Sequence, residues 1–375
     1  MSRLKVLFLL SEWNLGYGGV QNYCRQVVHA AAAMDSEIDV LVLRDRVKDA
    51  PPPGGNVRFH LCAFSPYLPI QKIVYFSKFV WLLLSRRPKV VVCGHLNLAV
   101  LPYLVNLLVC VPYMVQTYGI EVWETPETLR RRSIEKADVV FFISQFSKSR
   151  LIEKFRIPEN RFELLSPAVD VSVFSTCSSS GANLARKLGL EDKKVILTVS
   201  RLDRNERGKG HGVVLEAIKE LTPCMSDLTY IIVGRGDYAD DLKKHAKTLG
   251  IEDRVKFAGY VPEEELPAYY RLCDVFAMPS SKEGFGIVFL EALASGKPVI
   301  AGKFDGSSAP LQGGRLGLMV DPGNQEAVTT AIRDVLEGNV EPHLLDSSYL
   351  QVAVETFFGP DVMNARVREV LSRFV

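Results

Sequence analysis

Short apolar runs alternate with longer amphipathic segments along most of this 375-residue chain. In the first half, predicted strands lie at residues 4–10, 38–43, 90–93, 112–116 and 139–143. In the second half, they lie at residues 195–199, 230–233, 255–257, 275–278, 298–301 and 317–320. Helical patterns separate most of these runs, and such alternation predicts parallel sheets with helices on both faces. We therefore expect an α/β protein built from two Rossmann-like, doubly wound domains.

The rhythm breaks around residues 167–192, where Pro167 and the serine-rich run 177–181 interrupt the alternation. We predict a first domain over residues 1–170, a linker over 171–192, a second domain over 193–355 and a C-terminal helix within 356–375. Ligands of doubly wound sheets bind beyond the carboxyl ends of the strands. Two such domains facing each other would therefore share one cleft.

Composition narrows the class of protein. Seven scattered cysteines without a C-x-x-C pair argue against a disulfide framework or a zinc site and fit a reducing cytoplasm. The apolar run near the N-terminus is too short for the core of a signal peptide. Residues 1–170 carry 21 basic and 15 acidic side chains, whereas the remainder carries 24 and 28. Either this is chance variation, or the first half faces an anionic acceptor or membrane surface.

Two carboxylates eight residues apart frame a glycine-rich loop in the second half. The run from Glu283 to Gly286 predicts a loop, the residues after it a helix, and Gly296 its end. Glycines before a helix let backbone N–H groups approach an anion, and the helix N-terminus adds partial positive charge. Glu283 would lie at the mouth of this site and Glu291 about two turns inside the helix. A sugar nucleotide would employ both glutamates, since it has hydroxyls on either side of a diphosphate.

From Glu283 to Ile300 the chain resembles the Glu-x7-Glu hallmark of the retaining glycosyltransferases of family 4. The resemblance implies a GT-B fold with an acceptor-side first domain, a donor-binding second domain and a last helix that crosses back to the first domain. It also implies metal-independent transfer, without a cofactor, from a UDP- or GDP-sugar to a hydroxyl of a glycan or lipid-linked acceptor. Cell-surface polysaccharide or glycolipid synthesis, on the cytoplasmic side of a membrane, is the usual setting.

The resemblance also implies roles for residues of the second domain. Glu283 would orient the donor sugar and Glu291 the ribose hydroxyls. The expected donor-binding residues are Gly284, Phe285, Gly286, Ile287, Tyr260 and Val261, the last two beside the base.

A loop after strand 195–199 carries Arg201 and Lys209. A guanidinium fork and an ammonium point charge suit a diphosphate, and they would offset the charge that grows on a leaving nucleotide. Arg207 could take the place of the lysine, but Lys209 precedes Gly210 and His211, as in the family pattern.

In the first domain, Gly18 and Gly19 end a loop before a predicted helix and resemble the family's G-G-V-Q element. Gly19 is a candidate contact for a phosphate or the acceptor, and Gly18 for the acceptor. A histidine at a strand end is more often structural, but the family places one against the donor sugar, so we assign His95 a catalytic role. Glu121 is a candidate on the acceptor side.

Other functions remain open. Gly234 and Gly236 fit the G-x-G-x-x-A dinucleotide pattern, so an NAD-dependent oxidoreductase is one rival. A non-catalytic subunit that binds a nucleotide sugar is another. The Asp-x-Asp signature of metal-dependent transferases is absent, and we expect neither a metal site nor a nucleic-acid partner. Residues 71–87 form either a buried helix or one that lies on an anionic membrane surface.

Overall fold

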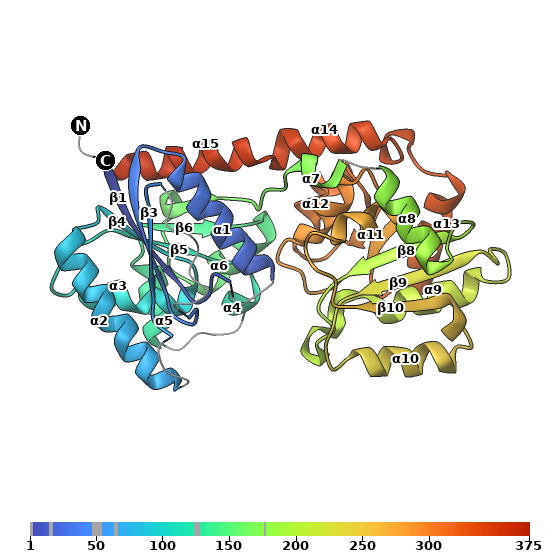
Figure 1. Cartoon of the computed structure of the whole chain (residues 1–375), viewed down its shortest axis with the longest axis horizontal. Coiled ribbons are helices and arrows are strands. Elements are labelled where there is room, and N and C mark those ends of the chain that lie inside the picture. The colour runs from blue at the N-terminus through green and yellow to red at the C-terminus, as the bar shows by residue number, and fades with distance from the viewer. Residues whose placement is uncertain (1–2, 15–17, 47–54, 64–66, 124–127, 176–177) are drawn as a thin grey trace. The chain divides into compact units, whose positions relative to one another are not determined.

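The computed structural model describes residues 3–14, 18–46, 55–63, 67–123, 128–175 and 178–375. The chain forms two compact units, and each is built on one sheet (Figure 1). The first unit comprises Met1–Ala168 and Pro360–Val375, and the second comprises Val169–Gly359.

The first unit has a seven-stranded parallel sheet in the order β3-β2-β1-β4-β5-β6-β7. Its strands are β1 (Leu4–Leu10), β2 (Ser36–Val42), β3 (Val57–Leu61), β4 (Val90–Cys93), β5 (Tyr113–Gln116), β6 (Val139–Phe142) and β7 (Phe162–Leu164). Among the central strands, β4 and β6 are continuous apolar runs and β1 is apolar except for Lys5, because both faces of a parallel sheet are covered. The sequence pattern does not predict β3 and β7, which lie at the two edges of this sheet.

Helices of the first unit are α1 (Gly19–Ala32), α2 (Leu68–Arg86), α3 (Val100–Val105), α4 (Ile120–Trp123), α5 (Thr128–Glu135), α6 (Gln145–Lys154) and α15 (Pro360–Leu371). The last of these, α15, packs on α1 although 327 residues separate their nearest ends. Arg366 of α15 and Arg373 just beyond it both donate to the carboxylate of Glu163 in β7. The expected return of the last helix to the first unit is thus present.

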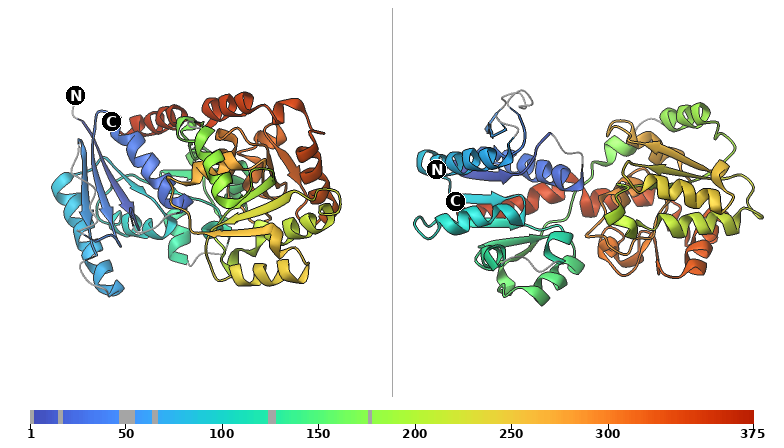
Figure 2. Two further views of the ribbon diagram at one scale, coloured as in Figure 1. Left: turned by 45° about the vertical axis from the view of Figure 1, so that its right-hand side comes forward. Right: turned by 90° about the horizontal axis from the view of Figure 1, so that it is seen from below.

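The second unit has a six-stranded parallel sheet in the order β10-β9-β8-β11-β12-β13. The strands are β8 (Lys194–Val199), β9 (Leu228–Val233), β10 (Val255–Gly259), β11 (Val275–Met278), β12 (Val299–Gly302) and β13 (Leu318–Val320). Its helices are α7 (Val171–Ser175), α8 (Ser178–Leu188), α9 (His211–Leu221), α10 (Ala239–Thr248), α11 (Leu266–Leu272), α12 (Ile287–Ala294), α13 (Gln325–Glu337) and α14 (Ser347–Phe358). Figure 2 shows both units from two further directions.

Residues 171–192, predicted as a linker, contain α7 and α8, and α8 packs against α11 within the second unit. Positions 181, 184, 185 and 188 of α8 are buried or half-buried. That is helical spacing, which the serine-rich start of the segment conceals in the sequence.

Strands β8, β11 and β12 are neighbours in the second sheet and run in the same direction. The loops that follow them therefore meet at one edge, where ligands of such sheets bind. In the described part of the chain, no helix is both long and apolar enough to cross a membrane.

Candidate functional site

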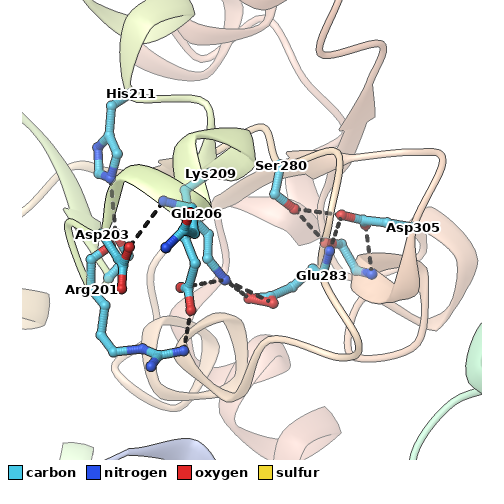
Figure 3. Close-up of polar contacts among 11 residues, drawn as sticks. Arg201, Asp203, Glu206, Lys209, His211, Ser280, Glu283 and Asp305 are labelled. Carbon is cyan, nitrogen blue, oxygen red and sulfur yellow. Dashed lines mark hydrogen bonds and ion pairs between the residues drawn. The ribbon is translucent and has the colours of Figure 1, made fainter. Parts of the chain in front are cut away.

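An ion pair joins the loop after β8 to the loop after β11 (Figure 3). Lys209 ends a short 3-10 helix (Arg204–Lys209), and its Nζ lies 2.6 Å and 3.1 Å from the two carboxylate oxygens of Glu283. Each side chain is 13% exposed, so water screens the pair only partly. Two predicted residues that lie 74 positions apart in the sequence, in two different motifs, are therefore in direct contact.

Glu206 adds a second carboxylate to this cluster. The guanidinium of Arg201 forms an ion pair with Glu206, whose other oxygen lies 3.9 Å from Lys209 Nζ. Cations and carboxylates thus alternate in the order Arg201, Glu206, Lys209, Glu283, as Figure 3 shows. Glu206 was not predicted from the sequence, although its position one helical turn before Lys209 is a usable signal.

Arg207, the alternative to Lys209, faces elsewhere. Its guanidinium pairs with Asp241 at 3.3 Å and lies 5.2 Å from the ring centre of Tyr238. The geometry therefore favours Lys209 as the cation that contacts Glu283.

The loop from Glu283 to Gly286 ends where α12 begins at Ile287. Gly286 has a φ of 87°, and a Cβ there would lie 2.4 Å from the ring of Phe289, so the turn requires glycine. No side chain caps α12, so its first turn can present backbone N–H groups to an anion.

Glu291 lies one turn inside α12 rather than the two turns predicted, because the helix begins at Ile287. Its carboxylate accepts a hydrogen bond of 2.6 Å from the hydroxyl of Tyr270, which is fully buried. Burial raises the pKa of Glu291 to about 7, and the negative charge of Glu263 adds to this shift. Near neutral pH, Glu291 therefore exists in both protonated and ionised forms.

The remaining predicted residues of the second unit differ in accessibility. The Phe285 side chain is buried against Phe358, with ring centres 5.8 Å apart, so a ligand could reach only the backbone there. Val261 is also buried. Tyr260 is 45% exposed, and the guanidinium of Arg235 lies 4.9 Å from its ring centre. A base could therefore stack beside Tyr260, whereas Val261 offers mainly backbone.

In the first unit, His95 follows β4 and caps a 3-10 helix (Leu96–Leu98), its Nδ1 accepting the Asn97 N–H at 3.1 Å. Burial lowers the pKa of His95, with a smaller opposing effect from Glu121. A neutral ring whose Nδ1 accepts carries its proton on Nε2. His95 can therefore donate one hydrogen bond from Nε2.

Glu121 and the glycine pair have local structural roles. The Glu121 carboxylate accepts hydrogen bonds from the backbone N–H groups of Tyr118 and Gly119 and so holds the turn before α4. Gly18 is the N-cap of α1 and Gly19 its first residue, with no side-chain cap. These amides can present N–H groups to an anion, as the sequence suggested.

The glycines of the dinucleotide-like pattern are explained by close packing. A Cβ at Gly234 would lie 1.8 Å from the backbone oxygen of Ser200, and one at Gly236 would lie 2.0 Å from that of Leu202. These glycines therefore let the loop after β9 pack against the loop that carries Arg201. Within the described residues, no group of three or more His, Cys, Asp or Glu side chains is placed to hold a metal ion.

Two family models match consecutive parts of the chain. The model described as Glycosyltransferase Family 4 matches residues 17–173, and the model described as Glycosyl transferases group 1 matches residues 182–347. All the predicted site residues lie within these two ranges.

A GDP-mannose-dependent alpha-(1-6)-phosphatidylinositol monomannoside mannosyltransferase of Mycolicibacterium smegmatis is 37% identical over 234 residues. The match covers 60% of this chain and 60% of that relative. A D-inositol 3-phosphate glycosyltransferase of Corynebacterium glutamicum is 34% identical, over 57% of this chain and 54% of that one. The chain thus matches only 54–60% of the length of these curated relatives.

Solved structures match over nearly the whole chain. HepE of Anabaena, in complex with UDP-glucose, has a TM-score of 0.80 at 21% identity and covers 99% of this chain and 100% of its own. Sucrose-phosphate synthase of Thermosynechococcus elongatus has a TM-score of 0.83 at 19% identity, covering 99% of each chain. At these identities, the likeness shows the fold, which is GT-B.

Proposed function

Because the chain belongs to glycosyltransferase family 4, we propose that it is a retaining glycosyltransferase that uses a nucleotide-diphosphate sugar and needs no metal. The observation that carries the proposal is the contact of Lys209 with Glu283 at the edge of the second sheet, with Arg201 joined to it through Glu206. This arrangement sets cations for a diphosphate directly beside a carboxylate for a sugar.

In the proposed reaction, the acceptor hydroxyl attacks the anomeric carbon from the face that the nucleotide leaves. The glycosidic bond to the phosphate breaks as the new bond forms, through an oxocarbenium-like state. The departing diphosphate takes the proton from the hydroxyl, so no protein nucleophile is required. Arg201 and Lys209 stabilise the charge on the leaving diphosphate, which is the electrostatic work that a metal does in other transferases.

Glu283 then orients the donor sugar through its hydroxyls, since its carboxylate can only accept hydrogen bonds when ionised. Glu291 accepts from the ribose hydroxyls, for which its ionised form is better suited. His95 donates from Nε2 to the donor sugar. Gly284, Gly286 and Ile287 present the backbone at the start of α12.

GDP-mannose is the first donor to test, because the relative of highest identity quoted above is named for it. UDP-glucose is the second, since it is bound in a structure of the same fold. We propose that the acceptor is a lipid-linked sugar or a glycan used to build cell-surface polysaccharides or glycolipids. The name of that relative includes such an acceptor, phosphatidylinositol monomannoside.

Transfer is tested with each radiolabelled donor and a membrane lipid extract, in EDTA, for the native chain and for Glu283→Ala and Lys209→Ala. The proposal predicts transfer by the native chain in EDTA and loss of most transfer in both variants. Donor binding without turnover by the native chain would instead support a non-catalytic subunit. Near-native rates in either variant would refute the site.

We further propose that α2 places the protein on an anionic membrane surface at the cytoplasmic face. This helix is buried on one side through Tyr75, Phe79, Leu82 and Leu83. Its other side exposes apolar residues, including Ile70, Ile73, Phe76, Trp81 and Leu84. Of the two alternatives left by the sequence, a wholly buried helix does not fit, because α2 is buried on one side only; exposed Lys72 and Arg87 add positive charge.

Sedimentation with vesicles checks this second proposal. The native chain should sediment with phosphatidylglycerol vesicles more than with phosphatidylcholine vesicles, and the double variant Ile73→Ser with Leu84→Ser should lose most of this binding. Ile152→Ser on α6 is the matched control, because Ile152 is also half exposed but lies on another helix. Equal sedimentation of all three proteins would contradict the assignment to α2.

A further inference from the structure

Asp305 is a buried carboxylate in the loop after β12, and it is 2% exposed. Its Oδ2 accepts hydrogen bonds from the Ser280 hydroxyl and from the backbone N–H of Glu283, both at 2.7 Å. Its Oδ1 accepts from the backbone N–H of Ser307 at 3.0 Å. Among the described residues, no cation forms an ion pair with Asp305, so these three donors offset its burial.

The loop after β12 forms hydrogen bonds with both peptide groups that flank the Cα of Glu283. The N–H of Glu283 donates to Asp305, and its carbonyl accepts from the N–H of Gly306 at 2.8 Å. Fixing both groups sets the direction of the Cα–Cβ bond of Glu283. A Cβ at Gly306 would lie 2.1 Å from the backbone oxygen of Gly284, so the two loops are in close contact.

We propose that Asp305 is a positioning residue: by holding the backbone of Glu283, it keeps the Glu283 carboxylate beside Lys209. Figure 3 shows the two ends of this arrangement, with Asp305 on the backbone side of Glu283 and Lys209 at its carboxylate. The role of Glu283 toward a donor sugar rests on the proposed function. The aim of its side chain rests on the geometry alone.

A purely structural role can be separated from a positioning role by Asp305→Asn. Asparagine is nearly isosteric and also caps helices well, so its single oxygen can keep the bond to the Ser307 N–H. However, an amide has one oxygen and one NH₂ group. In the orientation that keeps this bond, its NH₂ group would face the Ser280 hydroxyl and the Glu283 N–H, and the latter can only donate.

For Asp305→Asn we expect kcat with GDP-mannose or UDP-glucose, whichever the native chain uses, to fall about 100-fold, as for a misplacement of about 1 Å. The KM for the donor and the Kd for the free nucleoside diphosphate should stay within about threefold of native values, because Arg201 and Lys209 are untouched. Ser307→Ala is the matched control, since it removes a neighbouring hydroxyl but leaves both bonds to Oδ2. Its kcat should stay within about threefold.

Hydrogen–deuterium exchange of the peptide that contains Glu283 gives a readout that needs no turnover. We expect the Glu283 amide to be protected in the native chain and in Ser307→Ala, and to exchange at least about tenfold faster in Asp305→Asn. If Asp305→Asn does not fold, exchange in the native chain decides, and an unprotected Glu283 amide there overturns the proposal.

A native kcat in Asp305→Asn would also overturn the positioning role, unless fast exchange of the Ser307 amide alone shows that the asparagine oxygen still accepts from the Glu283 N–H. The proposed function would stand in either case. If the native chain transfers no sugar, the proposed function fails. The exchange measurement then still decides whether Asp305 holds the backbone of Glu283.

Discussion

Replacing Lys209 by methionine should destabilise the second unit, because Glu283 would lose its cation. Methionine keeps most of the apolar length of lysine, so the change mainly removes charge. Among the described residues, Lys209 is the only cation in an ion pair with Glu283. The variant therefore leaves the Glu283 carboxylate, which is only 13% exposed, without a cationic partner.

The size of the effect follows from the geometry. A hydrogen bond to a charged group contributes about 1.5–3 kcal/mol, and stranding a fully buried partner costs about 3–5 kcal/mol. Because both groups keep some contact with water, we expect Lys209→Met to cost about 2–3 kcal/mol. Glu283→Gln should cost about 1 kcal/mol or less, since Lys209 keeps Glu206 at 3.9 Å. The double variant should cost less than the sum of the two single variants, as no carboxylate is stranded.

The chain offers an internal control for the assay. All three tryptophans, Trp13, Trp81 and Trp123, belong to the first unit. Urea unfolding followed by tryptophan fluorescence therefore reports the first unit, whereas circular dichroism reports both. Lys209→Met should lower the free energy of unfolding seen by circular dichroism and leave the fluorescence transition within about 0.5 kcal/mol of native. An unchanged circular dichroism transition, or equal losses in Lys209→Met and Glu283→Gln, would refute this reasoning.

Three further predictions concern other contacts. In the folded chain the pKa of Glu291 is raised to about 7, whereas in the unfolded chain it has its ordinary value near 4.5. Between these two pH values the folded chain therefore holds a proton that the unfolded chain has lost. This difference in proton binding contributes at most about 3 kcal/mol to the free energy of unfolding. The contribution is fully present below about pH 4.5 and is lost as the pH rises through 7. Urea unfolding at pH 5 and pH 8 should show a smaller drop for Glu291→Gln, and an equal drop would contradict the shift. Gly236→Ala should destabilise the second unit by more than about 3 kcal/mol in urea, because its Cβ would lie 2.0 Å from the Leu202 oxygen; a loss below 1 kcal/mol would count against that packing. Glu163→Gln should lower the stability of the first unit by about 1–2 kcal/mol by weakening its bonds to Arg366 and Arg373, and an unchanged tryptophan transition would argue against this contact.

The alternation of strands and helices predicted most of the fold because the central strands are mostly apolar. The two edge strands of the first sheet, β3 and β7, escaped prediction for a physical reason. β3 places Arg58 and His60 among its apolar residues, since one side of an edge strand has no neighbour. β7 has only three residues, Glu163 among them. Neither pattern stands out from a loop in the sequence.

The candidate site was predictable where its signal lies within one short segment. Glu283 and Gly286 belong to one motif, and Arg201 and Lys209 to another. Asp305 and Tyr270 were not predicted, because they reach Glu283 and Glu291 only through the parallel arrangement of neighbouring strands. Glu206 does not stand out in the sequence, because the cations around it are typical of a solvated loop.

Binding of a nucleoside diphosphate at Lys209 tests the central claim most directly. Calorimetric titration with GDP, UDP, GDP-mannose, UDP-glucose and NADH in EDTA should show binding of one nucleotide family by the native chain. Lys209→Met should weaken that binding at least about tenfold, whereas Arg207→Met should leave it within about threefold, because Arg207 pairs with Asp241. Native affinity in Lys209→Met, or binding of NADH alone, would contradict the account.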